Sequence, residues 1–159
     1  MKKIFVLIFL IFFVSLGFTQ ETNSQKWSGT VRFKPLAFLV SAALSCPEVI
    51  IDWTPYVSKN IGIPIEFDVA TFSGNLFFGA MSGVEAILLE QSEKSGLYIA
   101  GLAGLYFIFS DIVFAGKFDV GYQFLFKKGF VFTPAIGLKY NSVNGFNVDL
   151  MVDIGFAYK

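Results

Sequence analysis

Apolar residues recur at every second position along most of the chain, and polar or small residues stand between them. In the segment 145–158, the residues on one set of alternate positions are Phe146, Val148, Leu150, Val152, Ile154, Phe156 and Tyr158. The positions between them include Asn147, Asp149 and Asp153. Successive side chains of a strand point to opposite faces of a sheet, so a spacing of two predicts β-structure.

The same unit occurs eight times. It predicts strands at residues 31–44, 47–57, 61–71, 75–90, 96–108, 111–126, 130–141 and 145–158. The short segments between these strands are rich in Gly, Asn, Ser and Lys, as hairpin turns require. A helical spacing fits none of the later segments. We therefore expect an all-β fold in which eight antiparallel strands follow one another up and down, with short turns at both ends.

The first twenty residues have a different character. Two lysines precede a continuous apolar run, which small and polar residues follow. This order is typical of a cleavable signal peptide, predicted here as residues 1–20. The alternative is a retained membrane-anchor helix, but the run is near the lower limit of roughly 17 to 25 residues for a span, and no basic stop signal follows it. Residues 21–30 would then form a polar leader, and residues 31–159 a single barrel domain.

The polar face of the predicted strands is not uniformly hydrophilic, because it mixes charges with Gly and Ala. An eight-stranded barrel has room inside for little more than its own side chains or one small ligand. Sixteen of the 21 phenylalanines lie after residue 20, and with the other bulky residues of the same faces they would overfill that interior. The pattern instead predicts a lumen lined by a structural polar network of Arg32, Lys34, Glu48, Asp52, Glu66, Asp68, Glu85, Lys117, Asp119, Lys139, Asp149 and Asp153.

With the charges inside, the bulky face points outward to lipid. We expect lipid contacts from Ile63, Ile65, Phe67, Phe118, Val120, Tyr122, Phe124, Ile136, Leu138, Leu150, Val152 and Ile154. The clear segments reach the length of about 9 to 11 residues that a membrane-crossing strand needs. Charged residues make up only 15% of the chain, whereas a water-facing designed surface has roughly 25 to 35%. Many aromatic residues also lie near strand ends, where interfacial girdles occur in membrane barrels.

Two segments carry a resemblance to a known family. GKFDVGYQFLFKKGFVFTPAIGLKYN (116–141) and the closing GFNVDLMVDIGFAYK (145–159) are similar to the small eight-stranded outer-membrane barrels of the OmpA-transmembrane and OmpW-like type. The resemblance implies a transmembrane β-barrel in the outer membrane of a diderm bacterium. It also implies that the membrane lipid is one partner and the outer-membrane assembly machinery another, bound through the C-terminal strand 145–158. The chain departs from the family at its end, where Lys159 follows the near-terminal aromatic Tyr158.

Several absences limit the chemistry. The chain has no histidine, so catalysis by a Ser-His or His-Asp pair is unavailable, and we expect no enzyme activity, no cofactor and no metal site. The pairs Glu66/Asp68 and Asp149/Asp153 could be general acids, but strand alternation explains their spacing. Without Lys2 and Lys3, ten of the twelve basic residues remain against twelve acidic ones. That balance argues against nucleic-acid binding, for which a basic stripe is typical.

The leading functional hypothesis is a non-enzymatic integral outer-membrane barrel with a structural or small-solute permeation role. A lumen lined by ion pairs favours a packed polar core over a bulk porin pore. The first alternative is a secreted or periplasmic lipocalin-like barrel that binds an apolar ligand. The second is a polytopic helical membrane protein, since the apolar stretch 97–116 has the length of one transmembrane helix.

Overall fold

A computed structural model describes residues 27–58, 60–92, 95–109, 111–126, 128–143 and 145–159. The predicted signal peptide and most of the predicted leader lie outside these residues. The elements in chain order are β1 (Gly29–Phe33), α2 (Pro35–Ala43), β2 (Glu48–Pro55), β3 (Ile61–Gly62), β4 (Ile65–Phe72), β5 (Asn75–Ser92), β6 (Ser95–Ile108), β7 (Asp111–Leu125), β8 (Phe130–Asn141) and β9 (Gly145–Tyr158).

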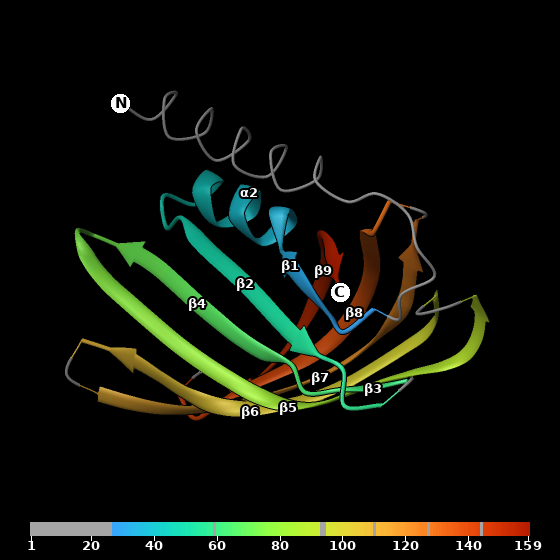
Figure 1. Ribbon diagram of the computed structural model, residues 1–159. Coiled ribbons are helices and arrows are strands. Elements are labelled where there is room, and N and C mark those ends of the chain that lie inside the picture. The colour runs from blue at the N-terminus through green and yellow to red at the C-terminus, as the bar shows by residue number, and fades with distance from the viewer. Residues whose placement is uncertain (1–26, 59, 93–94, 110, 127, 144) are drawn as a thin grey trace.

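The strands form a closed antiparallel barrel of eight strands, as the alternation predicts (Figure 1). The order around the wall is β1-β2-β4-β5-β6-β7-β8-β9, and β9 pairs again with β1. The strands β8 and β9 have the predicted bounds, and β7 ends one residue earlier than predicted. The apolar stretch 97–116 lies in the β6–β7 hairpin, so its interpretation as a transmembrane helix is wrong.

The predicted strand 61–71 is interrupted by a proline. Gly62 pairs with Glu85 and Ile65 pairs with Ser82, so β3 and β4 keep one register along β5. Pro64 has no N–H to donate to the ladder. Its carbonyl oxygen instead accepts a hydrogen bond from Ser82 Oγ at 2.9 Å. We therefore count β3 and β4 as one wall strand of the barrel.

The predicted strand 31–44 is wrong over most of its length. β1 begins at Gly29 and ends at Phe33, and the helix α2 follows from Pro35 to Ala43. Proline is favoured at the first position of a helix, because its fixed φ suits the helix and its missing N–H is not needed there. Apart from Ser41, the run LAFLVSAA is apolar throughout instead of alternating, and its Ala and Leu residues are strong helix formers. Short apolar runs of this kind fit a helix or a strand equally well by periodicity.

The barrel has two distinguishable ends. We call the first the Tyr158 end, because Tyr158 pairs there with Gly29; the strands β2, β5 and β7 also end there. The opposite end carries the other connections and is named the α2 end. Its β4–β5, β6–β7 and β8–β9 connections are short, but the β1–β2 connection runs from 34 to 47 and contains α2. The expectation of short turns at both ends is therefore wrong for this one connection.

The interior holds both charged and apolar side chains. Apolar packing is concentrated in one cluster on the inner faces of β5, β6 and β7, formed by Met81, Tyr98, Ala100, Leu102 and Ala115. The remainder of the buried set is largely polar, and it includes charged residues from β1, β2, β4, β5, β7 and β9. These polar side chains form the candidate functional site.

The charged interior of the barrel

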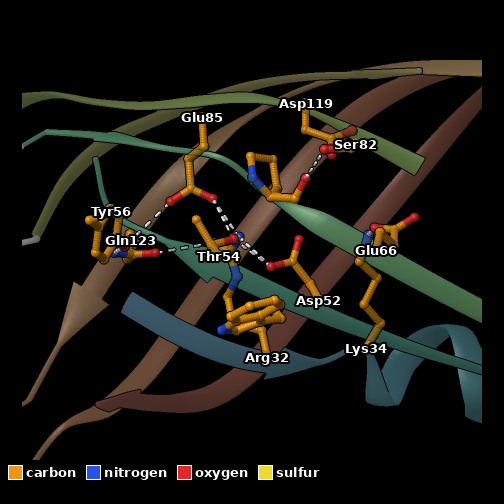
Figure 2. Close-up of polar contacts among 12 residues, drawn as sticks. Arg32, Lys34, Asp52, Thr54, Tyr56, Glu66, Ser82, Glu85, Asp119 and Gln123 are labelled. Carbon is orange, nitrogen blue, oxygen red and sulfur yellow. Dashed lines mark hydrogen bonds and ion pairs between the residues drawn. The ribbon is translucent and has the colours of Figure 1, made fainter. Parts of the chain in front are cut away.

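Arg32 joins four strands of the barrel. Its Nη2 donates hydrogen bonds to Asp52 Oδ1 and Thr54 Oγ1, each at 3.0 Å, and also forms an ion pair with Glu85. Its Nη1 donates to Gln123 Oε1 at 3.2 Å. Figure 2 shows these groups converging from β1, β2, β5 and β7. Because β5 and β7 each lie three strands from β1 around the wall, the contacts cross the interior.

A second set of ion pairs is centred on Glu66. Lys34 Nζ lies 2.7 Å from Glu66 Oε2, and Lys117 pairs with the same oxygen from β7. Lys117 Nζ also lies 3.1 Å from Asp119 Oδ2. Lys34 is the residue just before α2, so this set links the start of the helix to β4 and β7.

Alternation along β1, β4 and β7 places the charges of these two networks inside. Arg32, Glu66 and Lys117 each lie on the same strand face as the next charged or polar residue two positions away. Burying an unpaired charge costs far more than burying a paired one. Closure of the barrel brings an opposite charge to each of these three residues. The pattern within a single strand places a charge inside, but it does not determine which partner that charge meets across the interior.

Two glycines allow close approach within the wall, one to a neighbouring backbone and one to a buried carboxylate. Gly155 pairs with Arg32, and a Cβ at residue 155 would lie 2.7 Å from Arg32 Cα and 2.0 Å from the Val31 carbonyl oxygen. Gly137 pairs with Asp119, and a Cβ there would lie 2.2 Å from Asp119 Oδ1. Gly155 thus lets the backbone of β1 lie close to β9, and Gly137 leaves room for the Asp119 carboxylate.

The network is looser toward the α2 end. Lys139 Nζ lies 4.0 Å from Asp68 Oδ2 and 5.0 Å from the centre of the Tyr106 ring. The Lys139 side chain is 25% exposed, whereas that of Arg32 is fully buried. The interior is therefore most tightly closed at the level of Arg32 and Glu66, below the α2 end.

The predicted lumen residues fall into two groups. Nine are buried: Arg32, Lys34, Asp52, Glu66, Asp68, Glu85, Lys117, Asp119 and Asp153. The other three are half-buried: Glu48, Lys139 and Asp149. The structure brings Arg32, Asp52 and Glu85 together in one set, and Lys34, Glu66, Lys117 and Asp119 in another.

The residues predicted to face lipid lie on the opposite strand faces. Those that are exposed are Ile63, Phe67, Phe118, Phe124, Ile136, Leu138 and Leu150. Those that are half-buried are Ile65, Val120, Tyr122, Val152 and Ile154. None of the twelve is buried.

Sequence reasoning missed several neutral residues of the network, because the predicted network contained charged residues alone. Thr54 lies two positions after Asp52 on the same face, so its spacing could have found it. Tyr56 OH accepts a hydrogen bond from Gln123 Nε2 at 3.0 Å and lies 3.4 Å from Glu85 Oε1. The guanidinium group of Arg32 lies over the ring of Tyr98, with its Cζ 5.2 Å from the ring centre. It lies in a nearly continuous apolar stretch, where no polar spacing marks it.

The buried charges are not balanced in number. Three buried cations, Arg32, Lys34 and Lys117, face six buried carboxylates: Asp52, Glu66, Asp68, Glu85, Asp119 and Asp153. Each of the cations contacts at least one carboxylate. Among the described residues, no three acidic or thiol side chains are grouped as a metal ion would require.

The fold and the interior define the chain as a closed eight-stranded β-barrel with a charged core. Its sequence matches no protein-family model and no curated protein, and its structure matches no solved structure. No helix in the described part of the chain is both long and apolar enough to cross a membrane.

Proposed function

We propose that the chain is an integral outer-membrane β-barrel with a structural role and no enzyme activity. The observation that carries the proposal is the distribution of side chains across the wall. Large apolar residues on the outer face are well exposed, such as Phe67, Phe118 and Leu138, while the inner face holds Arg32, Glu66 and Glu85. In a soluble barrel the apolar face would be buried and the charged face would meet water. Exposed apolar patches of this extent mark contact with a membrane or another protein.

The closed wall supports the same proposal. A bilayer core offers no water to the backbone, so spanning strands must satisfy their N–H and C=O groups by pairing with one another. The β1–β9 and β5–β6 pairings join the ends of the sheet and remove its outer edges over the paired residues. Seven outward residues along β9, from Phe146 to Tyr158, are all apolar or aromatic. At about 3.4 Å per residue and a tilt of about 40°, such a strand spans the roughly 25 Å of a barrel's apolar band.

The interior favours a structural role over solute permeation. The contacts of Arg32 with Glu85 and Gln123, and those of Glu66 with Lys117, cross the lumen between strands that are not neighbours. A solute would have to pass through these buried side chains. We expect the barrel to be closed at this level, with small-solute permeation as the less favoured role.

A lipocalin-like carrier is the alternative from a different class. Such a protein needs an apolar internal cavity for its ligand. The buried residues here include nine charged side chains, and Arg32 and Lys34 occupy the interior with their carboxylate partners. The charged interior therefore argues against this alternative.

Location and assembly follow from the same proposal. The predicted signal peptide, residues 1–20, would export the chain, and the assembly machinery of the outer membrane would recognise the strand 145–158. That strand corresponds to β9, which closes the barrel against β1. Its aromatic end, Tyr158, accepts a hydrogen bond from Trp53 Nε1 at 2.8 Å on the outer surface.

Cell fractionation combined with electrophoresis tests the proposal. We expect the protein in the outer-membrane fraction, and we expect a change in its mobility on a detergent gel when the sample is boiled, since a folded barrel resists detergent until heated. A protein recovered from the periplasm with no such change would refute the membrane assignment and support the carrier. Single-channel recording in planar bilayers then separates the two roles, because steady conductance would refute the closed lumen.

A further inference from the structure

The barrel wall has a gap beside the end of β1. β1 ends at Phe33, which pairs with Ile51 of β2 and Ile154 of β9. Both neighbours continue past this point toward the α2 end. Residues 145–153 of β9 pair with β8 on one edge, and no described strand pairs with their other edge. The outward side chains of this part of β9 are all apolar. The unpaired backbone groups of its free edge therefore lie at the level of the barrel where the outer surface is hydrophobic.

The helix α2 occupies this gap. It contacts both β2 and β9, and it lies over the end of β1 in Figure 1. The ring of Phe38 lies 6.4 Å from that of Phe33. Phe33 is buried although its neighbour on the same strand face, Val31, is exposed. The helix therefore takes the place that a longer β1 would have filled.

Both ends of α2 are held by polar contacts. Lys34, the residue before the helix, points inward to Glu66. Near the other end, Ser41 Oγ donates to the Phe38 carbonyl oxygen at 3.1 Å and accepts from the Glu48 N–H at 2.9 Å. Ser41 is the one polar residue of the helix, so these two bonds leave α2 with no polar side chain that needs water.

The outward surface of α2 is apolar. Leu39, Val40 and Leu44 are 64%, 53% and 73% exposed, and no residue from 35 to 44 is charged. A helix that is hydrophobic on all sides is found in a protein core or in a membrane, and not at a water-facing surface. The strand β9, which α2 contacts, also carries exposed apolar side chains, since Val148 and Leu150 are 68% and 66% exposed.

We propose that α2 is part of the lipid-facing wall and that its outer surface contacts the acyl chains of the bilayer. This inference rests on the proposed membrane location of the barrel. A helix satisfies its own backbone hydrogen bonds, so it is the one element other than a paired strand that hydrocarbon accepts. Placed in the gap, α2 separates the unpaired edge of β9 from lipid and keeps the charged interior closed from the side.

Lipid-phase quenching tests the proposal on the full-length mature barrel. Cys46 is first replaced by serine, and a single cysteine is introduced by Val40→Cys and labelled with an environment-sensitive fluorophore. The barrel is reconstituted in phosphatidylcholine vesicles with and without doxyl-labelled phosphatidylcholine. We expect the Val40→Cys label to lose most of its fluorescence to the doxyl lipid and little to aqueous iodide.

Two matched labels make the outcomes distinguishable. Phe118→Cys, on the outer face of β7, is the control for a label that faces lipid. Ser142→Cys, in the exposed β8–β9 connection, is the control for a label that faces water. Quenching by doxyl lipid at 118 with quenching only by iodide at 40 would overturn the inference and leave the membrane barrel intact. If the label at 40 is protected from both quenchers and cross-linking yields dimers, a second copy of the chain covers α2 and the inference of lipid contact is wrong. Absence of doxyl quenching at both 40 and 118 would refute the proposed function itself.

A second variant guards against misfolding of the first. Leu39→Cys offers another exposed position on α2 and should give the same quenching pattern. Each labelled variant is accepted only if it keeps the heat-dependent mobility of the parent barrel. If both helix labels are quenched by iodide alone in folded barrels, α2 faces water and the inference is wrong.

Discussion

Replacement of Arg32 with methionine removes the side chain that joins β1 to three other strands. The substitution preserves much of the length and apolar stem but deletes the charge that contacts Asp52, Glu85 and Gln123. Glu85 is fully buried and Asp52 nearly so, and both would remain without their cation. Loss of one partner from a buried ion pair costs about 3 to 5 kcal/mol, because the remaining charge is left uncompensated. We expect Arg32→Met to lower the free energy of unfolding by that amount.

Urea unfolding of the barrel reconstituted in vesicles measures this change, with the fluorescence of Trp27 and Trp53 as the signal. Lys128→Met is the matched control, since Lys128 is an exposed residue between β7 and β8 and the substitution deletes the same charge outside the barrel interior. Substitutions at exposed positions of this kind usually change stability by at most about 0.5 kcal/mol. The difference between the two variants isolates the effect of burial from that of deleting a positive charge.

A double variant tests the cause of the loss. If the uncompensated carboxylate is responsible, adding Glu85→Gln to Arg32→Met removes one buried charge and should recover part of the stability. The two substitutions would then be non-additive, as expected for residues in direct contact. Equal losses for Arg32→Met and Lys128→Met, or strict additivity in the double variant, would refute the view that the Arg32 network stabilises the interior.

Three further outcomes are expected. Val120→Arg puts a charge at mid-strand on the outer face of β7 and should destabilise the inserted barrel by about 2 to 4 kcal/mol; no loss relative to Val120→Leu in the same urea assay would argue for a water-facing surface. Gly137→Ala should cost about 1 to 3 kcal/mol by overpacking, because its Cβ would lie 2.2 Å from Asp119 Oδ1. Gly101→Ala meets nothing within 4 Å and should be nearly neutral, so similar costs at both glycines would contradict the packing argument. Gln123→Ala should be destabilising by about 1 to 3 kcal/mol, since it leaves Tyr56 and Arg32 each without one buried hydrogen bond; an unchanged unfolding midpoint would show that Gln123 has no structural role.

Alternation with short turns was enough to predict most of the wall. β7, β8 and β9 are each marked by a spacing of two, and the nearly continuous apolar strand β6 is bounded by turn residues, so the limits of these strands follow from local chemistry. The same spacing separated the charged face from the apolar one. In the region after Thr30, the continuous run LAFLVSAA has no period of two, and the prediction of a strand there failed.

The sequence by itself therefore determined the class of fold, the number of wall strands and the face that carries the charges, because these depend on the order of residues within one strand. Only the tertiary structure decided which charges meet. Arg32 and Glu85 are 53 residues apart, and Lys117 and Glu66 are 51 apart. The strands of each pair are not neighbours, so these contacts form only because closure of the wall brings the two residues to the same level on opposite sides of the interior. The place of α2 was decided in the same way, since a short apolar run becomes a helix where it fills the gap that β2 and β9 leave beside the end of β1.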